Sequence, residues 1–421
     1  MAIDWLTKKS KGKDQIIRSV SYGSIALAFV ITVFHLLPND HYLKLNSSFD
    51  VDISLVHQKA AVCLDGSPAA YHLHRGFGSG SHSWVVFIEG GGWCHTIESC
   101  VRRKESALGS SHYMLKKPVK FNGILNHHQS LNPDFFNWNK VMIRYCDGAS
   151  LLGHGLSKNE NKTGLFFRGQ IIWEAIMEEL LARGLKDASQ AVLTGSSAGG
   201  LSTFLHCDNF HSLLPNTKRV KCFADGGYFL DSKDITGAMT IRSFYDDVVH
   251  LHGLKSMLPK DCIAKKEASQ CFFPQELIKF ISTPFLILNS AYDWWQVSHI
   301  LVPKTSNRSD SWLQCMMNIQ SCNPEHIGVL NGFRQTLISA ISTDFQDKKG
   351  SGFYINSCYQ HDQIWSDLTW HSYKTQNKTV SEAVGDWFFD RDEVKVIDCA
   401  YPCNPTCKHV NLTSTKYRLD R

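Results

Sequence analysis

The sequence lacks a strong excess of charge of either sign. Its 421 residues contain 44 Lys and Arg against 39 Asp and Glu, which gives a formal net charge of +5. Residues 1–18 alone carry +3, because they hold five Lys or Arg and two Asp, and this leaves +2 for the rest of the chain. Nucleic-acid-binding domains need a concentrated basic surface. The charge balance therefore gives no support for that class of function.

Residues 19–37 lack Asp, Glu, Lys and Arg altogether. A run of about 20 apolar residues can span a bilayer, and the preceding basic cluster predicts a cytosolic N-terminus. We expect a cytosolic tail at 1–18, a transmembrane signal-anchor at 19–37 and a stem at 38–60. A cleaved signal peptide is the alternative, although residues 36–40 offer no small-residue cleavage site. Either way, residues 38–421 enter the secretory pathway, as a type II membrane protein of the Golgi or cell surface if uncleaved.

Cysteine is absent before Cys63, so all 14 cysteines follow the apolar segment. An even number in that part of the chain indicates disulfides formed in an oxidising compartment. Cys399, Cys403 and Cys407 lie close together without a matching histidine, so we expect disulfides there and no metal site. Five N-x-S/T sequences predict glycosylation, at Asn46, Asn161, Asn307, Asn377 and Asn411.

Short apolar runs bounded by polar or glycine residues predict buried strands. These runs are residues 83–88, 140–146, 191–193, 220–224, 283–289 and 352–356. Amphipathic patterns predict helices at 168–183, after residue 200 and at 329–341, and residues 231–280 read as an insertion or lid. Strands that alternate with helices predict an α/β fold with a mostly parallel central sheet flanked by helices. We expect this single domain to span residues 61–421, stapled by disulfides.

Gly195-Ser196-Ser197-Ala198-Gly199 matches the G-x-S-x-G pattern of a nucleophile elbow. In such an elbow a strand turns sharply into a helix and presents the central serine, here Ser197. Glycines flank the serine because the strained turn leaves little room for side chains. The pattern also recurs by chance in a chain with 29 glycines, so the interpretation depends on its partners.

Asp293 and His361 each follow a predicted strand, and both come after Ser197 in the chain. The order nucleophile, acid, histidine, with each residue at a strand end, is that of an α/β-hydrolase triad. His361 would act as the base and Asp293 would hold its tautomer. Asp225 also ends a strand after Ser197 and remains an alternative acid, whereas Asp362 is too near His361 in sequence to reach the far ring nitrogen.

Three consecutive glycines, residues 90–92, follow the strand at 83–88. Such a run is costly unless the backbone must approach another group closely, and a simple tight turn is the alternative. A glycine-rich loop at this position would supply backbone N–H groups to an oxyanion hole. The N–H of Ala198, directly after the nucleophile, would be a further donor.

Several long motifs together resemble the plant pectin acetylesterases and, more distantly, the animal carboxylesterase Notum. They are CLDGSPAAYHLHRGFGSG (63–80), EGGGWC (89–94), RYCDGAS (144–150), TGSSAGG (194–200), ILNSAYDWWQ (287–296), INSCYQHDQ (355–363) and YPCNPTC (401–407). The resemblance covers roughly residues 60–408. It implies an α/β-hydrolase fold, a triad of Ser197, Asp293 and His361, oxyanion donors at Gly91, Gly92 and Ala198, and no metal or cofactor.

The function implied by this resemblance is hydrolysis of acetyl esters in pectin through an acetyl-enzyme, in the cell wall if the chain is secreted. Three alternatives stay open: deacylation of a lipidated protein, deacetylation of another polysaccharide such as xylan, and an inactive polysaccharide-binding protein on a hydrolase fold. The intact triad and glycine loop count against the last, because a binding protein has no need of them.

Ser196 and Asp362 depart from the family pattern, because plant relatives usually carry cysteine at both positions. Both residues flank predicted catalytic residues, so their joint presence suggests that this chain lacks one disulfide beside the site. We also expect the negative charge of Asp362 to favour the protonated form of His361.

Overall fold

The computed structural model describes residues 50–115, 119–154, 163–306, 308–345 and 348–412. The chain divides into two units, Met1–Ser47 and Ser48–Arg421, and the description here concerns the second. The predicted tail at 1–18, the predicted membrane span at 19–37 and the sequon at Asn46 lie outside the described residues. Within the described ranges, no helix is long and apolar enough to cross a membrane.

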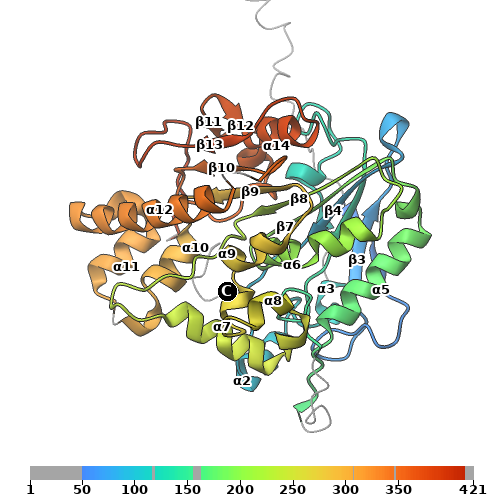
Figure 1. Ribbon diagram of the computed structural model, residues 1–421, viewed down its shortest axis with the longest axis horizontal. Helices are drawn as coiled ribbons and strands as arrows, with labels where there is room; N and C mark the ends of the chain where they lie inside the picture. The colour runs from blue at the N-terminus through green and yellow to red at the C-terminus, as the bar shows by residue number, and fades with distance from the viewer. Residues whose placement is uncertain (1–49, 116–118, 155–162, 307, 346–347, 413–421) are drawn as a thin grey trace, which may run out of the picture. The chain divides into compact units, whose positions relative to one another are not determined.

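A nine-stranded sheet forms the centre of the second unit, in the order β13-β10-β9-β8-β7-β4-β6-β3-β2 (Figure 1). Adjacent strands from β13 to β6 pair in parallel, and β3 pairs antiparallel with both β6 and β2. The strands are β2 (Ile53–Leu55), β3 (Ala70–His74), β4 (Ser83–Ile88), β6 (Asn139–Ile143), β7 (Gln190–Ser196), β8 (Arg219–Asp225), β9 (Phe285–Ser290), β10 (Gly352–Asn356) and β13 (Lys395–Ile397). The prediction of a mostly parallel sheet is therefore confirmed.

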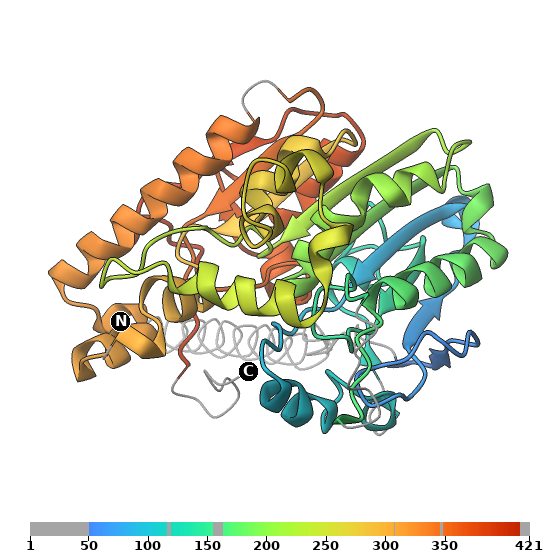
Figure 2. The ribbon, with the colours of Figure 1, turned by 60° about the horizontal axis from the view of Figure 1, so that its bottom comes forward.

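Helices cover both faces of this sheet, because successive strand residues point to opposite sides. On β4, for example, Val86 and Ile88 join one hydrophobic core, whereas Val85 and Phe87 join the other. The first core includes residues of α5 (Gly169–Ala182), α6 (Ala198–Ser212), α7 (Thr240–Leu251), α9 (Pro274–Leu277) and α12 (Pro324–Phe345). The second includes residues of α13 (Asp367–His371) and α14 (Val380–Phe388). Figure 2 shows α5, α7 and α12 together on one side of the sheet.

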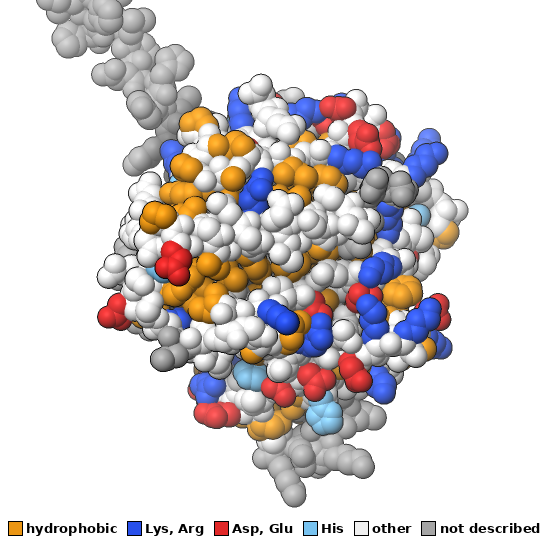
Figure 3. Space-filling view, turned by 60° about the vertical axis from the view of Figure 1, so that its left-hand side comes forward, with side chains coloured by type: hydrophobic (Ala, Val, Ile, Leu, Met, Phe, Trp, Pro, Cys, Tyr) orange, Lys and Arg blue, Asp and Glu red, His pale blue; other side chains and the backbone are white. Residues whose placement is uncertain are grey.

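Shorter elements connect these layers. The helices are α2 (Ile97–Lys104), α3 (Ser111–Met114), α8 (Lys260–Ile263), α10 (Trp294–Gln296) and α11 (Asp310–Met317). Two small ladders join β1 (Asp50–Val51) to β5 (Val119–Lys120) and β11 (Lys374–Thr375) to β12 (Lys378–Thr379). On the face in Figure 3, basic and acidic side chains are interspersed between hydrophobic patches and are not separated by sign.

The structure corrects one predicted boundary. The predicted stem at 38–60 is wrong in its second half, because β1 and β2 lie at residues 50–55 and β2 is part of the main sheet. The domain therefore begins before residue 61. The predicted insertion at 231–280 is the helical connection from β8 to β9, and it contains α7, α8 and α9.

All 14 cysteines form disulfides, as predicted. The pairs are Cys63–Cys146, Cys94–Cys100, Cys207–Cys222, Cys262–Cys271, Cys315–Cys322, Cys358–Cys407 and Cys399–Cys403. The last two pairs tie the C-terminal segment to itself and to the loop after β10.

Candidate active site

The elbow at Ser197 has the strained geometry that its sequence predicts. Ser197 lies between β7 and α6 with φ of 57° and ψ of −126°, a conformation that non-glycine residues rarely adopt. A Cβ on Gly195 would overlap the carbonyl oxygen of Gly199, and one on Gly199 would overlap that of Ile88. The flanking glycines are therefore required by the close approach of the backbone on both sides of the turn.

The structure brings the three predicted triad residues together. Nε2 of His361 lies 2.8 Å from Oγ of Ser197. Its Nδ1 lies 2.8 Å and 2.9 Å from the two carboxylate oxygens of Asp293. All three residues are buried, with exposed fractions of 7%, 6% and 1% for Ser197, His361 and Asp293. With its proton on Nδ1, the imidazole can accept the serine proton at Nε2.

Asp293 is itself held in place by the helix that follows it. Its Oδ1 accepts hydrogen bonds from the backbone N–H of Trp295 at 2.9 Å and of Gln296 at 3.2 Å. This is an N-cap contact at the start of α10. The carboxylate is therefore oriented toward His361 by local backbone structure.

The charge state of His361 results from opposing effects. Burial alone would lower the pKa of this imidazole, but the carboxylates of Asp293, Asp362 and Asp225 raise its pKa to about 9. Oδ1 of Asp362 lies 3.7 Å from Nε2, and the Asp362 side chain is 41% exposed. The expectation that this side chain is too near in sequence to reach the far ring nitrogen is therefore wrong. The expected effect of Asp362, to favour the protonated imidazole, has the same sign.

Asp225 was the alternative acid, and the structure places it elsewhere. Its Oδ2 accepts hydrogen bonds from the backbone N–H of Gln363 at 2.7 Å and of Ile364 at 3.0 Å, and from Oγ of Ser196 at 3.1 Å. Burial and the nearby Asp362 raise the pKa of this carboxyl. Asp225 therefore holds the backbone of the His361 loop against the elbow, while Asp293 holds the ring.

The C-terminal segment also fixes the His361 loop. Cys358 is bonded to Cys407. The backbone N–H of Tyr359 donates to Nδ1 of His409 at 3.0 Å, and the carbonyl oxygen of Tyr359 accepts from the N–H of Val410 at 3.0 Å. Three contacts therefore join two adjacent residues of the loop to residues 407–410.

The glycine loop approaches the nucleophile closely. A Cβ on Gly90 would lie 2.5 Å from the carbonyl oxygen of Ser196 and 2.8 Å from Cβ of Ser197. Gly91 and Gly92 have φ of 145° and 64°, values that favour glycine. Close approach, more than a simple tight turn, thus explains the three glycines.

Backbone N–H groups of the glycine loop and at the start of α6 are candidates for binding an oxyanion. Those of Gly91, Gly92 and Trp93 donate to no acceptor in the described part of the chain. Ala198 is the first residue of α6, where N–H groups have no partner within the helix. The sequence predicts Gly91, Gly92 and Ala198 as oxyanion donors, and that role stays a prediction. The sequence analysis did not consider Trp93, whose N–H likewise has no acceptor among the described residues.

Aromatic rings enclose His361. The Trp295 ring stacks on His361 with centroids 6.0 Å apart, and the Trp294 ring meets it edge-on at 5.6 Å. Phe229 packs against Trp93 at 4.9 Å and against Trp295 at 5.0 Å. Trp93, Phe229 and Trp295 are at most 8% exposed. These packed, buried rings shield one side of His361 from water.

Two residue groups have the spacing of metal ligands, but their chemistry does not suit a metal. One contains Cys94, Cys100 and His252, and the other contains Asp398 and two cysteines. The cysteines in both groups are joined in disulfides, whereas cysteine binds metal as a free thiolate. Neither group therefore suggests a metal centre.

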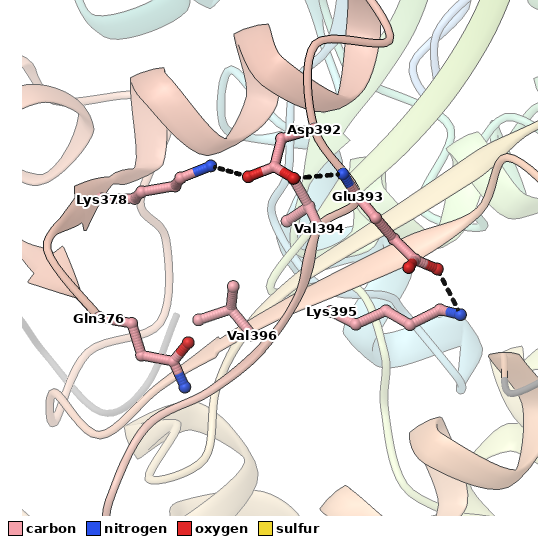
Figure 4. Close-up of a pocket in the computed structure, with 7 residues that line it drawn as sticks. All are labelled: Gln376, Lys378, Asp392, Glu393, Val394, Lys395 and Val396. Atoms are coloured by element: carbon pink, nitrogen blue, oxygen red, sulfur yellow. Dashed lines mark hydrogen bonds and ion pairs between the residues drawn. The ribbon is translucent and has the colours of Figure 1, made fainter.

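A surface pocket of about 280 Å³ lies beside the edge strand β13 (Figure 4), and no residue of the triad lines it. It is lined by Gln376, Lys378, Asp392, Glu393, Val394, Lys395 and Val396. Its charged side chains pair with one another, Lys378 with Asp392 and Lys395 with Glu393. Nothing in this lining suggests a reaction.

Of the predicted glycosylation sites, Asn377 and Asn411 are exposed, as glycan attachment requires. Asn46, Asn161 and Asn307 lie outside the described residues. Glycosylation at all five remains a prediction.

Comparison with known proteins agrees with this geometry. The pectinacetylesterase family pattern matches residues 45–408. The chain is 52% identical to pectin acetylesterase 5 of Arabidopsis thaliana over 363 residues, covering 86% of this chain and 84% of that protein. It is 27% identical to palmitoleoyl-protein carboxylesterase notum1' of Xenopus laevis, covering 86% and 75%. The structure of the Wnt deacylase Notum from Drosophila matches with a TM-score of 0.70 at 23% identity, covering 85% and 99%, and shows the same α/β-hydrolase-like fold.

Proposed function

Because the chain belongs to the pectinacetylesterase family, we propose that it is a serine esterase that removes acetyl groups from the galacturonan of pectin. The observation that supports this most directly is the continuous hydrogen-bonded series Asp293–His361–Ser197. It lies beside a loop whose N–H groups are unpaired. An inactive binding protein would not require this arrangement.

In the proposed mechanism, Nε2 of His361 takes the proton of Ser197 while Oγ attacks the acetyl carbonyl carbon. The carbonyl oxygen becomes negative and accepts hydrogen bonds from the N–H groups of Gly91, Gly92 and Ala198. Each such donor typically stabilises the transition state by about 3 kcal/mol. The C–O bond to the sugar then breaks, and His361 returns the proton to the leaving oxygen. Water, deprotonated by His361, hydrolyses the acetyl-enzyme and releases acetate.

The packed rings beside the site favour a short acyl group. Trp93, Phe229 and Trp295 contact one another edge to face, and a long acyl chain would have to displace them. The distant relatives are named for palmitoleoyl-protein substrates, which carry a long chain. Acetyl esters therefore fit this site better than lipidated proteins, while acetylated xylan remains an alternative polymer.

We also propose the cellular setting from the sequence pattern. Residues 1–18 would form a cytosolic tail and residues 19–37 a signal-anchor or signal peptide. The esterase domain would lie in the secretory lumen or the cell wall, with glycans at the five predicted asparagines. The seven disulfides support this compartment.

The decisive experiment measures acetate release from acetylated pectin and from acetylated xylan. Ser197→Ala tests the mechanism, and Ser212→Ala is a matched control, because Ser212 is an exposed serine at the end of the same helix. We expect release from pectin that is lost in Ser197→Ala and kept in Ser212→Ala. Equal activity in Ser197→Ala would refute the mechanism, and activity on xylan alone would refute the substrate.

A further inference from the structure

One arginine from α2 lies directly behind the glycine loop. Nη1 of Arg103 donates to the carbonyl oxygen of Gly91 at 2.8 Å, and its Nε donates to that of Leu108 at 3.0 Å. The guanidinium carbon lies 5.1 Å from the centre of the Tyr145 ring. Nη2 is buried and has no hydrogen-bond partner in the described part of the chain. The hydrogen bonds of the guanidinium therefore go to backbone carbonyl oxygens. Asp147 and Glu89 interact with it electrostatically, without a direct hydrogen bond.

The contact with Gly91 determines where the next N–H points. In a trans peptide the C=O and the N–H point in opposite directions, so the N–H of Gly92 faces away from Arg103. The loop has two distinct sides, because a Cβ on Gly91 would meet Leu108 and Arg103, whereas one on Gly90 would meet Ser197. The side opposite Arg103 is therefore the side of the nucleophile.

A second carbonyl of the loop is fixed in the same way. Tyr145 donates from its hydroxyl to the carbonyl oxygen of Gly92 at 2.7 Å, and that hydroxyl accepts from the N–H of Ser150 at 3.0 Å. Oγ of Ser150 accepts from Nε1 of Trp93 and donates to the carbonyl oxygen of Ala198, both at 2.8 Å. The loop and the first turn of α6 are thus held by one hydrogen-bonded network.

We propose that Arg103 is a positioning residue for acyl transfer. Its guanidinium fixes and polarises the Gly91–Gly92 peptide, so that the Gly92 N–H is a stronger donor to the oxygen that becomes negative. The inference rests on the esterase mechanism proposed above and goes beyond it, since Arg103 touches neither substrate nor triad. Hydrogen bonds to an ionised donor are roughly twice as strong as neutral ones, and burial strengthens them further.

This role predicts a selective effect on the chemical step. The bound ester has a nearly neutral carbonyl oxygen, whereas the transition state carries an oxyanion. An interaction that strengthens only in the transition state affects kcat and leaves KM nearly unchanged. A residue that merely supported the fold would instead lower stability and the amount of active protein.

Arg103→Gln and Arg102→Gln form a matched pair for the test. Arg102 is the preceding residue of α2, is 66% exposed and pairs with Glu98. With p-nitrophenyl acetate as substrate, we expect Arg103→Gln to lower kcat about 30-fold with little change in KM. Arg102→Gln should match the wild type. The active-site concentration is taken from the nitrophenol burst, and the melting temperature is measured for each variant.

Arg103→Lys keeps the charge but loses the planar guanidinium, whose fixed fork donates to two carbonyls from different nitrogens. We therefore expect its kcat to lie between those of Arg103→Gln and the wild type. A kcat in Arg103→Gln equal to that of the wild type overturns the inference, as does a change confined to KM. If Arg103→Gln does not fold, Arg103→Lys decides, and a wild-type kcat in that variant overturns the inference. Failure of the proposed esterase mechanism can be told apart from failure of this inference, because Ser197→Ala would then retain activity on p-nitrophenyl acetate.

Discussion

Asp225 and Asp293 are two buried carboxylates at the carboxyl ends of neighbouring parallel strands, β8 and β9. Asp293 contacts the ring of His361, whereas Asp225 contacts the backbone of the loop that carries it. The two aspartates have different contacts because they lie at different distances from the ends of their strands. Asp225 is the last residue of β8 and lies in register with Ser196, so it stays at the elbow. Asp293 lies three residues beyond the end of β9 and reaches the imidazole. The two carboxylates lie at the ends of adjacent strands but differ in their contacts: Asp293 orients the ring of His361, and Asp225 anchors the loop that carries it.

Of the variants that test these two roles, Asp293→Asn should lower activity the most. An amide can donate to Nδ1, which would leave the proton on Nε2 and prevent that nitrogen from accepting the serine proton. We expect kcat/KM on p-nitrophenyl acetate to fall about 10⁴-fold with little change in melting temperature. A fall of less than about tenfold would show that Asp293 does not select the tautomer.

Asp225→Ala should act mainly on stability. It removes the acceptor of two backbone N–H groups and of the Ser196 hydroxyl, all in a buried position. We expect the free energy of unfolding in urea to fall by about 3–5 kcal/mol, with a smaller loss of kcat than in Asp293→Asn. Asp225→Asn keeps one oxygen acceptor and should lose less stability. A catalytic loss as large as that of Asp293→Asn, without destabilisation, would contradict the separation of roles.

Asp362→Asn should change the pH dependence of activity. His361 must be neutral to accept the serine proton, so activity rises with pH as His361 loses its proton. Asp362 raises the pKa of His361, and its removal should move the acid limb of the kcat/KM profile down by about 1 pH unit. Asp392→Asn is the control, since that carboxylate is 56% exposed and lies in the surface pocket beside β13. An unchanged acid limb in Asp362→Asn would show that His361 does not respond to this charge.

The double variant Ser196→Cys with Asp362→Cys should have the smallest effect on rate. It tests whether these two positions can form the disulfide that the cysteines of the plant relatives suggest. Ser196 and the residue after Asp362 both bind Oδ2 of Asp225, so the two positions converge. We expect mass spectrometry of the folded protein to find an eighth disulfide, and the acid limb to shift as in Asp362→Asn. Two free thiols would argue against a lost disulfide at this place.

The triad was predictable because it depends on strand ends. Ser197, Asp293 and His361 each follow a run of buried apolar residues, and the carboxyl ends of parallel strands meet at one edge of the sheet. The strand prediction at 352–356 matches β10 residue for residue. Asp225 could not be told from Asp293 by this reasoning, because both follow strands in the correct order.

Other features gave no local pattern. β1 and β2 have two and three residues, too few for an alternation of apolar and polar positions to be recognised, so the sequence predicts a stem there. Arg103, Tyr145 and Ser150 reach the glycine loop through side-chain contacts between segments distant in sequence. Neither periodicity nor composition reports such contacts.

The attachment of the His361 loop to residues 407–410 has a consequence for biosynthesis. All three triad residues precede Cys407, His409 and Val410 in the chain. Until Cys407 pairs with Cys358 and residues 409–410 are in place, the loop lacks this disulfide and both backbone contacts at Tyr359. A nascent chain would therefore hold a complete set of catalytic residues and remain inert. Maturation of the enzyme would coincide with oxidation of that final pair.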